Sequence, residues 1–333
     1  MHFFAYGIAQ SDAMMRPHPP APDTPPDMTA PFHFIAGLPR SGSTLLAALL
    51  RQNPRFHASM SSPLARMTSS VLVEMAGEDG PLVSPDKRRR VLRGLFDAYY
   101  AEERATREVV FDTNRGWGTR LPLLVELFGD VKMICMVRDV ASVMDSFEVL
   151  VRKNVFERSG LFQDERERAT LASRTEALLL PNRTIGYALA SLKEAFYGEH
   201  AHSLLVVEYD QLVRFPAQTL QLIYQFLGEP LFEHSFDTLQ YDEPGFDNGI
   251  ATPGLHLVRP SVQTVARRSV LPPDLHERLS QLNFWRQPGH SRAHLVRQVH
   301  AGAGDGDDAA RLVIASADEI SEPDPLPELH RLP

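Results

Sequence analysis

Apolar residues along the chain fall into short continuous runs separated by longer segments with helical spacing. The runs Phe32–Gly37, Val131–Val137 and Ser203–Val207 are typical of strands buried on both faces of a parallel sheet. Between them, apolar residues three and four positions apart predict helices. The predicted helices are Ser43–Arg51, Leu64–Met75, Asp86–Glu103, Leu121–Phe128, Asp139–Arg152, Ala169–Tyr197 and Pro216–Leu227.

This alternation of strands and helices predicts a single α/β domain with a mostly parallel, P-loop-type sheet flanked by helices. One more short strand, Val109–Phe111, is expected to end at Asp112. In such folds the ligand lies at the carboxyl ends of the strands. The loop after Gly37 lies at one of these ends, and Asp112, Arg138 and Tyr209 lie at others.

Both ends of the chain depart from this pattern. Residues 1–31 contain a proline-rich stretch and predict a disordered leader, and Met28 could be the natural start. Residues 301–333 are acidic and rich in glycine, aspartate and proline, which predicts a largely disordered tail with at most a short helix. The folded domain is therefore expected over residues 32–300.

Composition narrows the choice of partners. The chain has 333 residues, of which 43% are hydrophobic, so a sizeable core is available. Its net charge of −8 argues against a general nucleic-acid binder. Cys135 is the single cysteine, which rules out an intramolecular disulfide and fits a reducing compartment. No apolar stretch approaches the roughly 20 residues of a membrane span, and the N-terminus makes a poor signal peptide.

The segment Gly37–Thr44, with the sequence GLPRSGST, carries the most specific chemistry. It joins a predicted strand to a helix N-terminus, where backbone N–H groups bind phosphate or sulfate. Its two glycines are five positions apart, as in a P-loop, but Ser43 follows Gly42 where a P-loop has lysine. The basic residue is Arg40, inside the loop. The site therefore suits a nucleotide phosphate but not ordinary Mg-ATP chemistry.

A second candidate anion site follows the strand Val131–Val137. Arg138 stands at the strand end, and Ser142 and Ser146 are four residues apart, on one face of the next helix. A guanidinium and hydroxyl groups together could grip a second phosphate. Taken alone, an Arg-Asp pair before a helix is more often an N-cap with an ion pair. The presence of the upstream loop favours the phosphate site.

Together, PRSGSTLL and RDVASVMDS resemble the two nucleotide-binding signatures of sulfotransferases that use 3′-phosphoadenosine 5′-phosphosulfate (PAPS). A third segment, VEYDQLVRFP followed by FLG, is similar to a later segment of that family. The resemblance covers residues 32–290 in the same chain order. PRSGSTL is most similar to the tyrosylprotein sulfotransferase branch and its bacterial relatives.

The resemblance implies roles for individual residues. The first loop would hold the 5′-phosphosulfate, and an Arg and a Ser eight residues apart, here Arg138 and Ser146, would hold the 3′-phosphate. A late basic loop, Gly254–Pro260 with Arg267–Ser269, would cover the nucleotide. Tyr209 would approach the adenine. The expected nucleotide-binding residues are Arg40, Ser41, Gly42, Ser43, Thr44, Arg138, Ser146 and Tyr209.

A sulfuryl group carries less negative charge than a phosphoryl group, so a metal clamp is less necessary and no metal is expected. Arg40 is the expected donor to the bridging and leaving oxygens. Many relatives carry a lysine near position 113, and Arg115 is its expected replacement. The catalytic glutamate of the tyrosylprotein enzymes has no counterpart in ASMSSPL. Ser61 could orient the acceptor, with Asp112 or His57 as the base.

We therefore expect a PAPS-dependent sulfotransferase that acts on a hydroxyl group, first of all on a tyrosine of a peptide or protein. A glycan or small-molecule acceptor remains an alternative, as do a P-loop small-molecule kinase and a nucleotide binder without catalysis. No nucleic-acid or membrane partner is expected, and a homodimer stays open. The lack of targeting signals favours a bacterial-type cytoplasmic enzyme, because the animal tyrosine sulfotransferases are Golgi membrane proteins.

Overall fold

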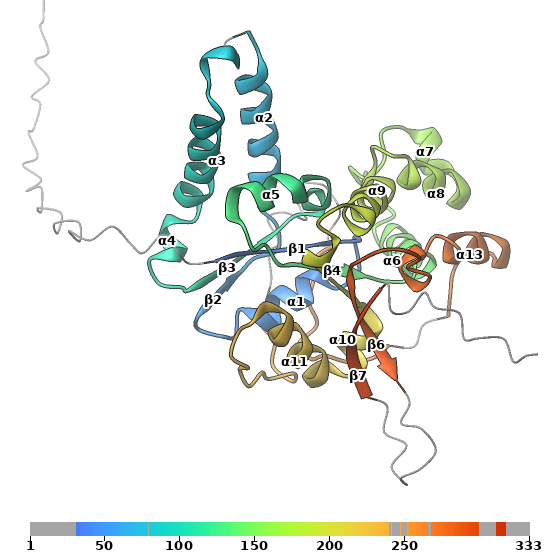
Figure 1. The fold of residues 1–333 in the computed structure, drawn as a ribbon. Coiled ribbons are helices and arrows are strands. Elements are labelled where there is room, and N and C mark those ends of the chain that lie inside the picture. The colour runs from blue at the N-terminus through green and yellow to red at the C-terminus, as the bar shows by residue number, and fades with distance from the viewer. Residues whose placement is uncertain are drawn as a thin grey trace, which may run out of the picture.

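The computed structural model describes residues 31–78, 80–239, 241, 247, 252, 254–265, 268–299 and 311–317. In these ranges seven strands form one sheet in the order β2-β3-β1-β4-β5-β6-β7 (Figure 1). All neighbouring strands pair in parallel except β7, which is antiparallel to β6. The strands are β1 (Phe32–Gly37), β2 (Phe56–Ala58), β3 (Val109–Thr113), β4 (Met133–Val137), β5 (Leu204–Glu208), β6 (His294–Val299) and β7 (Arg311–Ser316).

Helices cover both faces of the sheet, because alternate side chains of each buried strand point to opposite sides. Phe34 of β1 belongs to a core packed by α2, α3, α5, α6, α8, α9 and α13, whereas Ile35 belongs to a core packed by α1, α10 and α11. In Figure 1 the pair α2–α3 projects upward from the sheet, and α11 lies below it. The α-helices of these two layers are α1 (Ser43–Leu50), α2 (Leu64–Ala76), α3 (Pro85–Tyr99), α5 (Leu121–Phe128), α6 (Val140–Lys153), α8 (Leu171–Leu179), α9 (Thr184–Tyr197), α10 (Tyr209–Arg214), α11 (Pro216–Leu227) and α13 (Pro273–Ser280).

Short helical segments complete the described chain. They are α4 (Ala101–Arg104), α7 (Glu165–Ala169) and the 3-10 turns η1 (Gly80–Leu82), η2 (Arg115–Arg120), η3 (Ala201–Ser203) and η4 (Phe284–Arg286). The structure confirms the predicted fold class, a single α/β domain with a mostly parallel sheet between helices.

Four sequence predictions need correction. The helix predicted over Asp86–Glu103 is two helices, α3 and α4, which are separated at Tyr100. The helix predicted over Ala169–Tyr197 is two helices, α8 and α9, because Pro181 lies between them and disfavours a helical conformation of the residue before it. Strand β3 continues through Asp112 to Thr113. Strand β7 lies within residues 301–333, where a largely disordered tail was predicted, because pairing with β6 gives this short apolar run a place at the sheet edge.

Candidate active site

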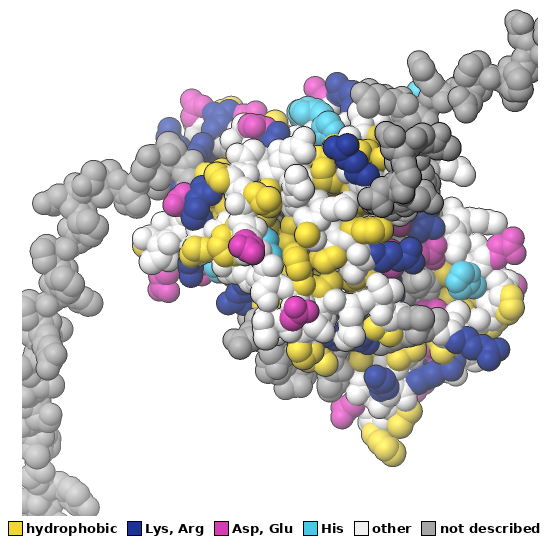
Figure 2. All heavy atoms as spheres, turned by 90° about the horizontal axis from the view of Figure 1, so that it is seen from below, with side chains coloured by type: hydrophobic (Ala, Val, Ile, Leu, Met, Phe, Trp, Pro, Cys, Tyr) yellow, Lys and Arg dark blue, Asp and Glu magenta, His cyan; other side chains and the backbone are white. Residues whose placement is uncertain are grey.

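A cavity of about 550 Å³ opens at the carboxyl ends of β1, β4 and β5. Among the described residues, five arginines and a single carboxylate line it, so this lining is strongly positive, although the whole chain carries a net charge of −8. On the face of the molecule seen in Figure 2, by contrast, basic and acidic side chains are interspersed among apolar ones. The charged lining residues are Arg40, Arg115, Arg138, Arg183, Arg259 and Asp210.

Two positions at the loop after β1 have a backbone conformation that favours glycine. Gly37 and Gly42 have φ angles of 107° and 91°, in the left-handed region. A Cβ on Gly37 would lie 2.0 Å from the carbonyl oxygen of Met136, and one on Gly42 would lie 2.7 Å from Cδ2 of Tyr209. The loop therefore presses against β4 on one side and against Tyr209 on the other.

The start of helix α1 offers backbone donors to the cavity. The first helical hydrogen bond runs from Leu46 N–H to the carbonyl of Gly42, and no side chain caps the helix. The N–H groups of Ser43, Thr44 and Leu45 consequently have no partner within the helix. These residues line the cavity, and the first turn contains no acidic residue. Such a helix start attracts an anion.

Ser41 has a different role from its neighbours in the loop. Its side chain is fully buried, and its Oγ lies 2.5 Å from the carbonyl oxygen of Leu38 and 2.8 Å from that of Met136. The hydroxyl therefore ties the loop to β4. Ser41 is absent from the cavity lining, whereas the other predicted nucleotide-binding residues all line it.

The second predicted anion site lies in the same cavity. The Arg138 guanidinium lies over the Tyr209 ring, 4.5 Å from its centroid. The Nε of Arg138 is buried and has no hydrogen-bond partner among the described residues. Arg40 Nε donates a hydrogen bond of 3.0 Å to Ser146 Oγ, which links the loop to α6. The residues predicted to hold two phosphates thus form one continuous wall.

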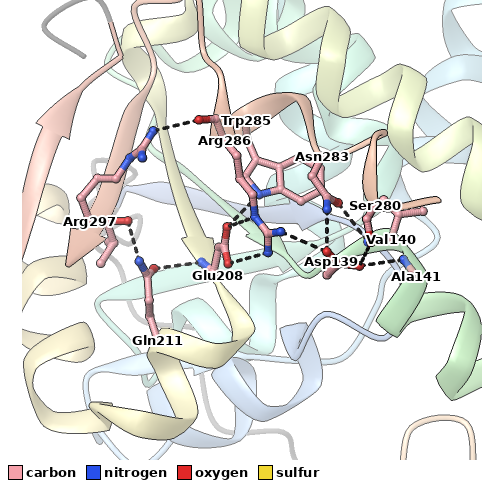
Figure 3. Close-up of polar contacts among 11 residues, drawn as sticks. Asp139, Val140, Ala141, Glu208, Gln211, Ser280, Asn283, Trp285, Arg286 and Arg297 are labelled. Carbon is pink, nitrogen blue, oxygen red and sulfur yellow. Dashed lines mark hydrogen bonds and ion pairs between the residues drawn. The ribbon is translucent and has the colours of Figure 1, made fainter. Parts of the chain in front are cut away.

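A polar cluster behind this wall joins the ends of β4 and β5 (Figure 3). Arg286 forms ion pairs with Glu208 and with Asp139, both at 3.0 Å. Asp139 also caps helix α6 at Ala141 N–H and accepts a hydrogen bond of 2.7 Å from Asn283. Because Arg138 and Tyr209 directly adjoin Asp139 and Glu208, the cluster fixes the backbone from which both cavity residues project.

The match to known proteins now identifies the family. The family model described as "Sulfotransferase family" matches residues 31–234, more than half of the chain. The chain belongs to the sulfotransferase family. The matched range contains the loop, Arg138, Ser146 and Tyr209, so the cavity is built mainly from the part shared with the family. A search of curated proteins found no matching sequence.

Solved sulfotransferase structures are also similar to the chain. The sulfotransferase domain from the curacin biosynthetic pathway is 18% identical, with a TM-score of 0.48, over 75% of this chain and 95% of that one. The corresponding domain of the olefin synthase of Synechococcus PCC 7002 is 20% identical, with a TM-score of 0.40, over 75% and 93%. A sulfotransferase from Alicyclobacillus acidocaldarius is 19% identical, with a TM-score of 0.41, over 65% and 88%.

Arg115 and Ser61, which the sequence analysis expects to act near the sulfuryl group and the acceptor, also line this cavity. Arg115 is accessible from the cavity, and its guanidinium contacts no carboxylate among the described residues. The surrounding protein hinders hydration and lowers the pKa of Arg115, but a guanidinium stays charged at neutral pH. Ser61 is exposed and also lines the cavity. Arg40, Arg115 and Ser61 thus line one cavity.

Asp112, one of the two residues that the sequence analysis considers as a base, lies outside the cavity lining. It is fully buried, and its carboxylate accepts hydrogen bonds of 2.6 Å from Tyr100 Oη and 2.5 Å from Trp117 Nε1. Burial raises the pKa of Asp112, while bonds from Ser62, Tyr100 and Trp117 act in the opposite direction. Alternation along β3 turns Asp112 into the core, so its geometry is that of a structural residue.

Replacing Asp112 with alanine is therefore expected to lower stability rather than catalysis. The change leaves buried donors, Tyr100 Oη and Trp117 Nε1 among them, without an acceptor, which should reduce the free energy of unfolding by about 3 kcal/mol. Urea denaturation measures this loss, and turnover per folded molecule should stay within about threefold of the wild type. Tyr100→Phe removes only the Tyr100 hydroxyl that donates to Asp112, so it should lower the free energy of unfolding by a smaller amount. A stable Asp112→Ala protein without turnover would contradict this structural role.

His57 is likewise absent from the cavity lining and packs edge-on against Tyr100 at a ring-centroid distance of 5.5 Å. Burial lowers its pKa. The late basic loop does reach the cavity, through residues 255–259 and 261–265, whereas Arg267 lies outside the described residues. Within that loop the structure reveals a pair that the sequence analysis missed, His256 with Asp247.

The described residues contain no cluster of three or more histidine, cysteine, aspartate or glutamate side chains suited to a metal ion. Nor does any described helix combine the length and apolar character that crossing a membrane requires.

Proposed function

We propose that this sulfotransferase transfers the sulfuryl group of PAPS to an acceptor hydroxyl. The supporting observation is one cavity that combines an uncapped helix start with a buried, unpartnered guanidinium nitrogen on Arg138. An anion with two separated phosphate groups matches this pair of features. The Tyr209 ring beside Arg138 offers an aromatic surface to a purine.

In this proposal the residues divide the work along the cavity. Arg40 and the N–H groups at the start of α1 hold the 5′-phosphosulfate and stabilise the charge that grows on the leaving phosphate oxygen. Arg138 and Ser146 hold the 3′-phosphate and set the position of the nucleotide. Arg115 lies on the acceptor side and stabilises the sulfuryl oxygens. Catalysis then depends on in-line positioning and electrostatic stabilisation.

A tyrosine of a peptide or protein is the proposed acceptor. This proposal rests on the resemblance of PRSGSTL to the tyrosylprotein branch and on the acidity of a phenol, whose pKa of about 10 makes it easier to deprotonate than a sugar hydroxyl. The absence of a carboxylate from ASMSSPL fits an acceptor that needs less help from a strong base. Glycan and small-molecule hydroxyls are the competing acceptors to be tested beside it.

The test is transfer of labelled sulfate from PAPS to a panel of tyrosine peptides, simple phenols, alcohols and glycans. We expect labelled product from at least one tyrosine peptide, and faster transfer to it than to any glycan. Transfer to glycans or alcohols alone would overturn the tyrosine proposal and leave sulfuryl transfer standing. Turnover of Mg-ATP in place of PAPS, or tight binding of adenosine 3′,5′-bisphosphate (PAP) without any transfer, would overturn the proposed function.

A further inference from the structure

The cavity wall contains a histidine that is held by a buried carboxylate. His256 Nδ1 and Asp247 Oδ1 are 2.6 Å apart, and the backbone N–H of His256 donates to Asp247 Oδ2 at 2.9 Å. The His256 side chain is 19% exposed and that of Asp247 is 7% exposed. One carboxylate therefore holds both the ring and the backbone of a residue that lines the cavity.

The arrangement fixes which ring nitrogen carries the proton. A carboxylate can only accept a hydrogen bond, so Nδ1 of His256 is the donor and a neutral ring has its lone pair on Nε2. Thr252 supports Asp247 in turn. Thr252 N–H donates to the Asp247 carbonyl at 3.0 Å, and the Thr252 hydroxyl lies 2.8 Å from Ser159 Oγ. A bonded Nδ1 and an Nε2 that accepts protons are the features of a positioned base.

The surrounding charges favour the neutral ring. Burial lowers the pKa of His256 below its usual value of 6.5, and the nearby guanidinium groups of Arg40 and Arg115 lower it further. The Asp247 carboxylate acts in the opposite direction. At neutral pH the ring is therefore unprotonated and able to accept a proton. The same two arginines are those proposed to bind the sulfuryl group, and His256 lines the cavity together with them.

The other side chains considered as bases lack this combination. Asp112 and His57 do not line the cavity. Asp210, a lining carboxylate that the sequence did not single out as a base, is exposed on α10, and no described side chain forms a hydrogen bond with it.

We propose that His256, oriented by Asp247, is the general base that deprotonates the acceptor hydroxyl. This proposal rests on the proposed function. As the acceptor oxygen forms its bond to sulfur, the bond from sulfur to the 5′-phosphate oxygen breaks, and that oxygen leaves with the electron pair as part of PAP. The hydroxyl proton moves to Nε2 of His256, and the imidazolium formed then releases it to solvent. His256 is thus a catalytic residue, and Asp247 is a positioning residue.

The first test is nuclear magnetic resonance of protein labelled with ¹⁵N-histidine, in which the His256 signals are those lost in His256→Asn. We expect the tautomer with a proton on Nδ1 and a titration midpoint below 6.5. Asp247→Asn should change this tautomer, an effect that a merely structural role of Asp247 would not produce. A proton on Nε2 of neutral His256, or a charged ring at pH 7, would overturn the proposal.

The second test is kinetic. His256→Asn keeps an N–H donor for Asp247 but removes the acceptor nitrogen, so kcat should fall about 100-fold or more while the affinity for PAP stays unchanged. The acidic limb of the pH–rate profile should disappear with it. The control is His202→Asn, an exposed histidine outside the cavity lining, which should behave as the wild type.

The outcomes separate the two proposals. A wild type that transfers sulfate, together with an equally active His256→Asn variant, would overturn the base assignment and leave the proposed function intact. A wild type that transfers sulfate to no acceptor on the panel would overturn the proposed function and the base assignment with it.

Discussion

Replacement of Arg40 with alanine is expected to lower sulfuryl transfer about 10³-fold. The residue occupies the loop at a φ of 59°, an unusual conformation for a residue other than glycine, and this conformation places it in the cavity wall. Its guanidinium is the charged donor closest in sequence to the helix start that would hold the phosphosulfate. A donor that meets charge developing on a leaving oxygen contributes mainly to kcat. The measurement is kcat and KM for PAPS at saturating acceptor.

The matched control is Arg66→Ala, which removes an exposed arginine of α2 that is absent from the cavity lining. It should leave kcat unchanged. Arg40→Lys keeps a positive charge but loses the hydrogen bond from Nε to Ser146, so its rate should lie between those of the wild type and Arg40→Ala. If Arg40→Ala transfers sulfate as fast as the Arg66→Ala control, this cavity is not the site of transfer.

The central part of the fold was predictable because a strand that is buried on both faces of a sheet is a continuous apolar run in the sequence. Strands β1, β4 and β5 are continuous apolar runs, and each is followed by a helix with apolar residues on one face. The edge of the sheet was not predictable in this way. β6 becomes exposed toward its end, and β7 is a short run in an acidic segment. Only their pairing with each other and with β5 makes them strands.

That the residues proposed to bind the nucleotide share one cavity was predictable for a related reason. These residues are adjacent to strand ends or lie at fixed spacings from them, and parallel strands bring those ends to one edge. Whether a residue near the end of β3 reaches the cavity depends instead on the direction of its side chain. Asp112 stands near a strand end, but the neighbouring Thr113 lines the cavity while Asp112 turns into the core. Sequence position alone does not distinguish these two directions.

No pattern in the sequence predicts the contact between Asp247 and His256. The two residues are nine positions apart in a stretch of sequence without helical or strand periodicity, so spacing does not predict their contact. Gly254, with a positive φ of 80°, turns the chain two residues before His256. The sequence does predict a basic loop around His256, but its basic residues indicate phosphate contacts rather than a base.

Replacement of Arg138 with alanine is expected to weaken PAP binding about 30- to 150-fold. Charge-assisted hydrogen bonds are worth about 2–3 kcal/mol, and the buried Nε of Arg138 has no protein partner among the described residues to compete with a phosphate. The prediction is specific to one phosphate of the ligand. Adenosine 5′-monophosphate lacks the 3′-phosphate, so the same substitution should change its affinity little. Isothermal titration calorimetry with both nucleotides measures the difference.

Two further variants make this comparison decisive. Arg90→Ala removes an exposed arginine of α3 that is absent from the cavity lining, and this variant should bind both nucleotides as the wild type does. Arg138→Lys keeps the charge but not the planar, forked donor that stacks on Tyr209, and should recover only part of the affinity for PAP. Equal weakening of both nucleotides by Arg138→Ala would mean that the residue supports the cavity as a whole. Unchanged PAP binding would mean that the 3′-phosphate binds elsewhere. The nucleotide would then lie along the cavity wall in a different direction from the one proposed.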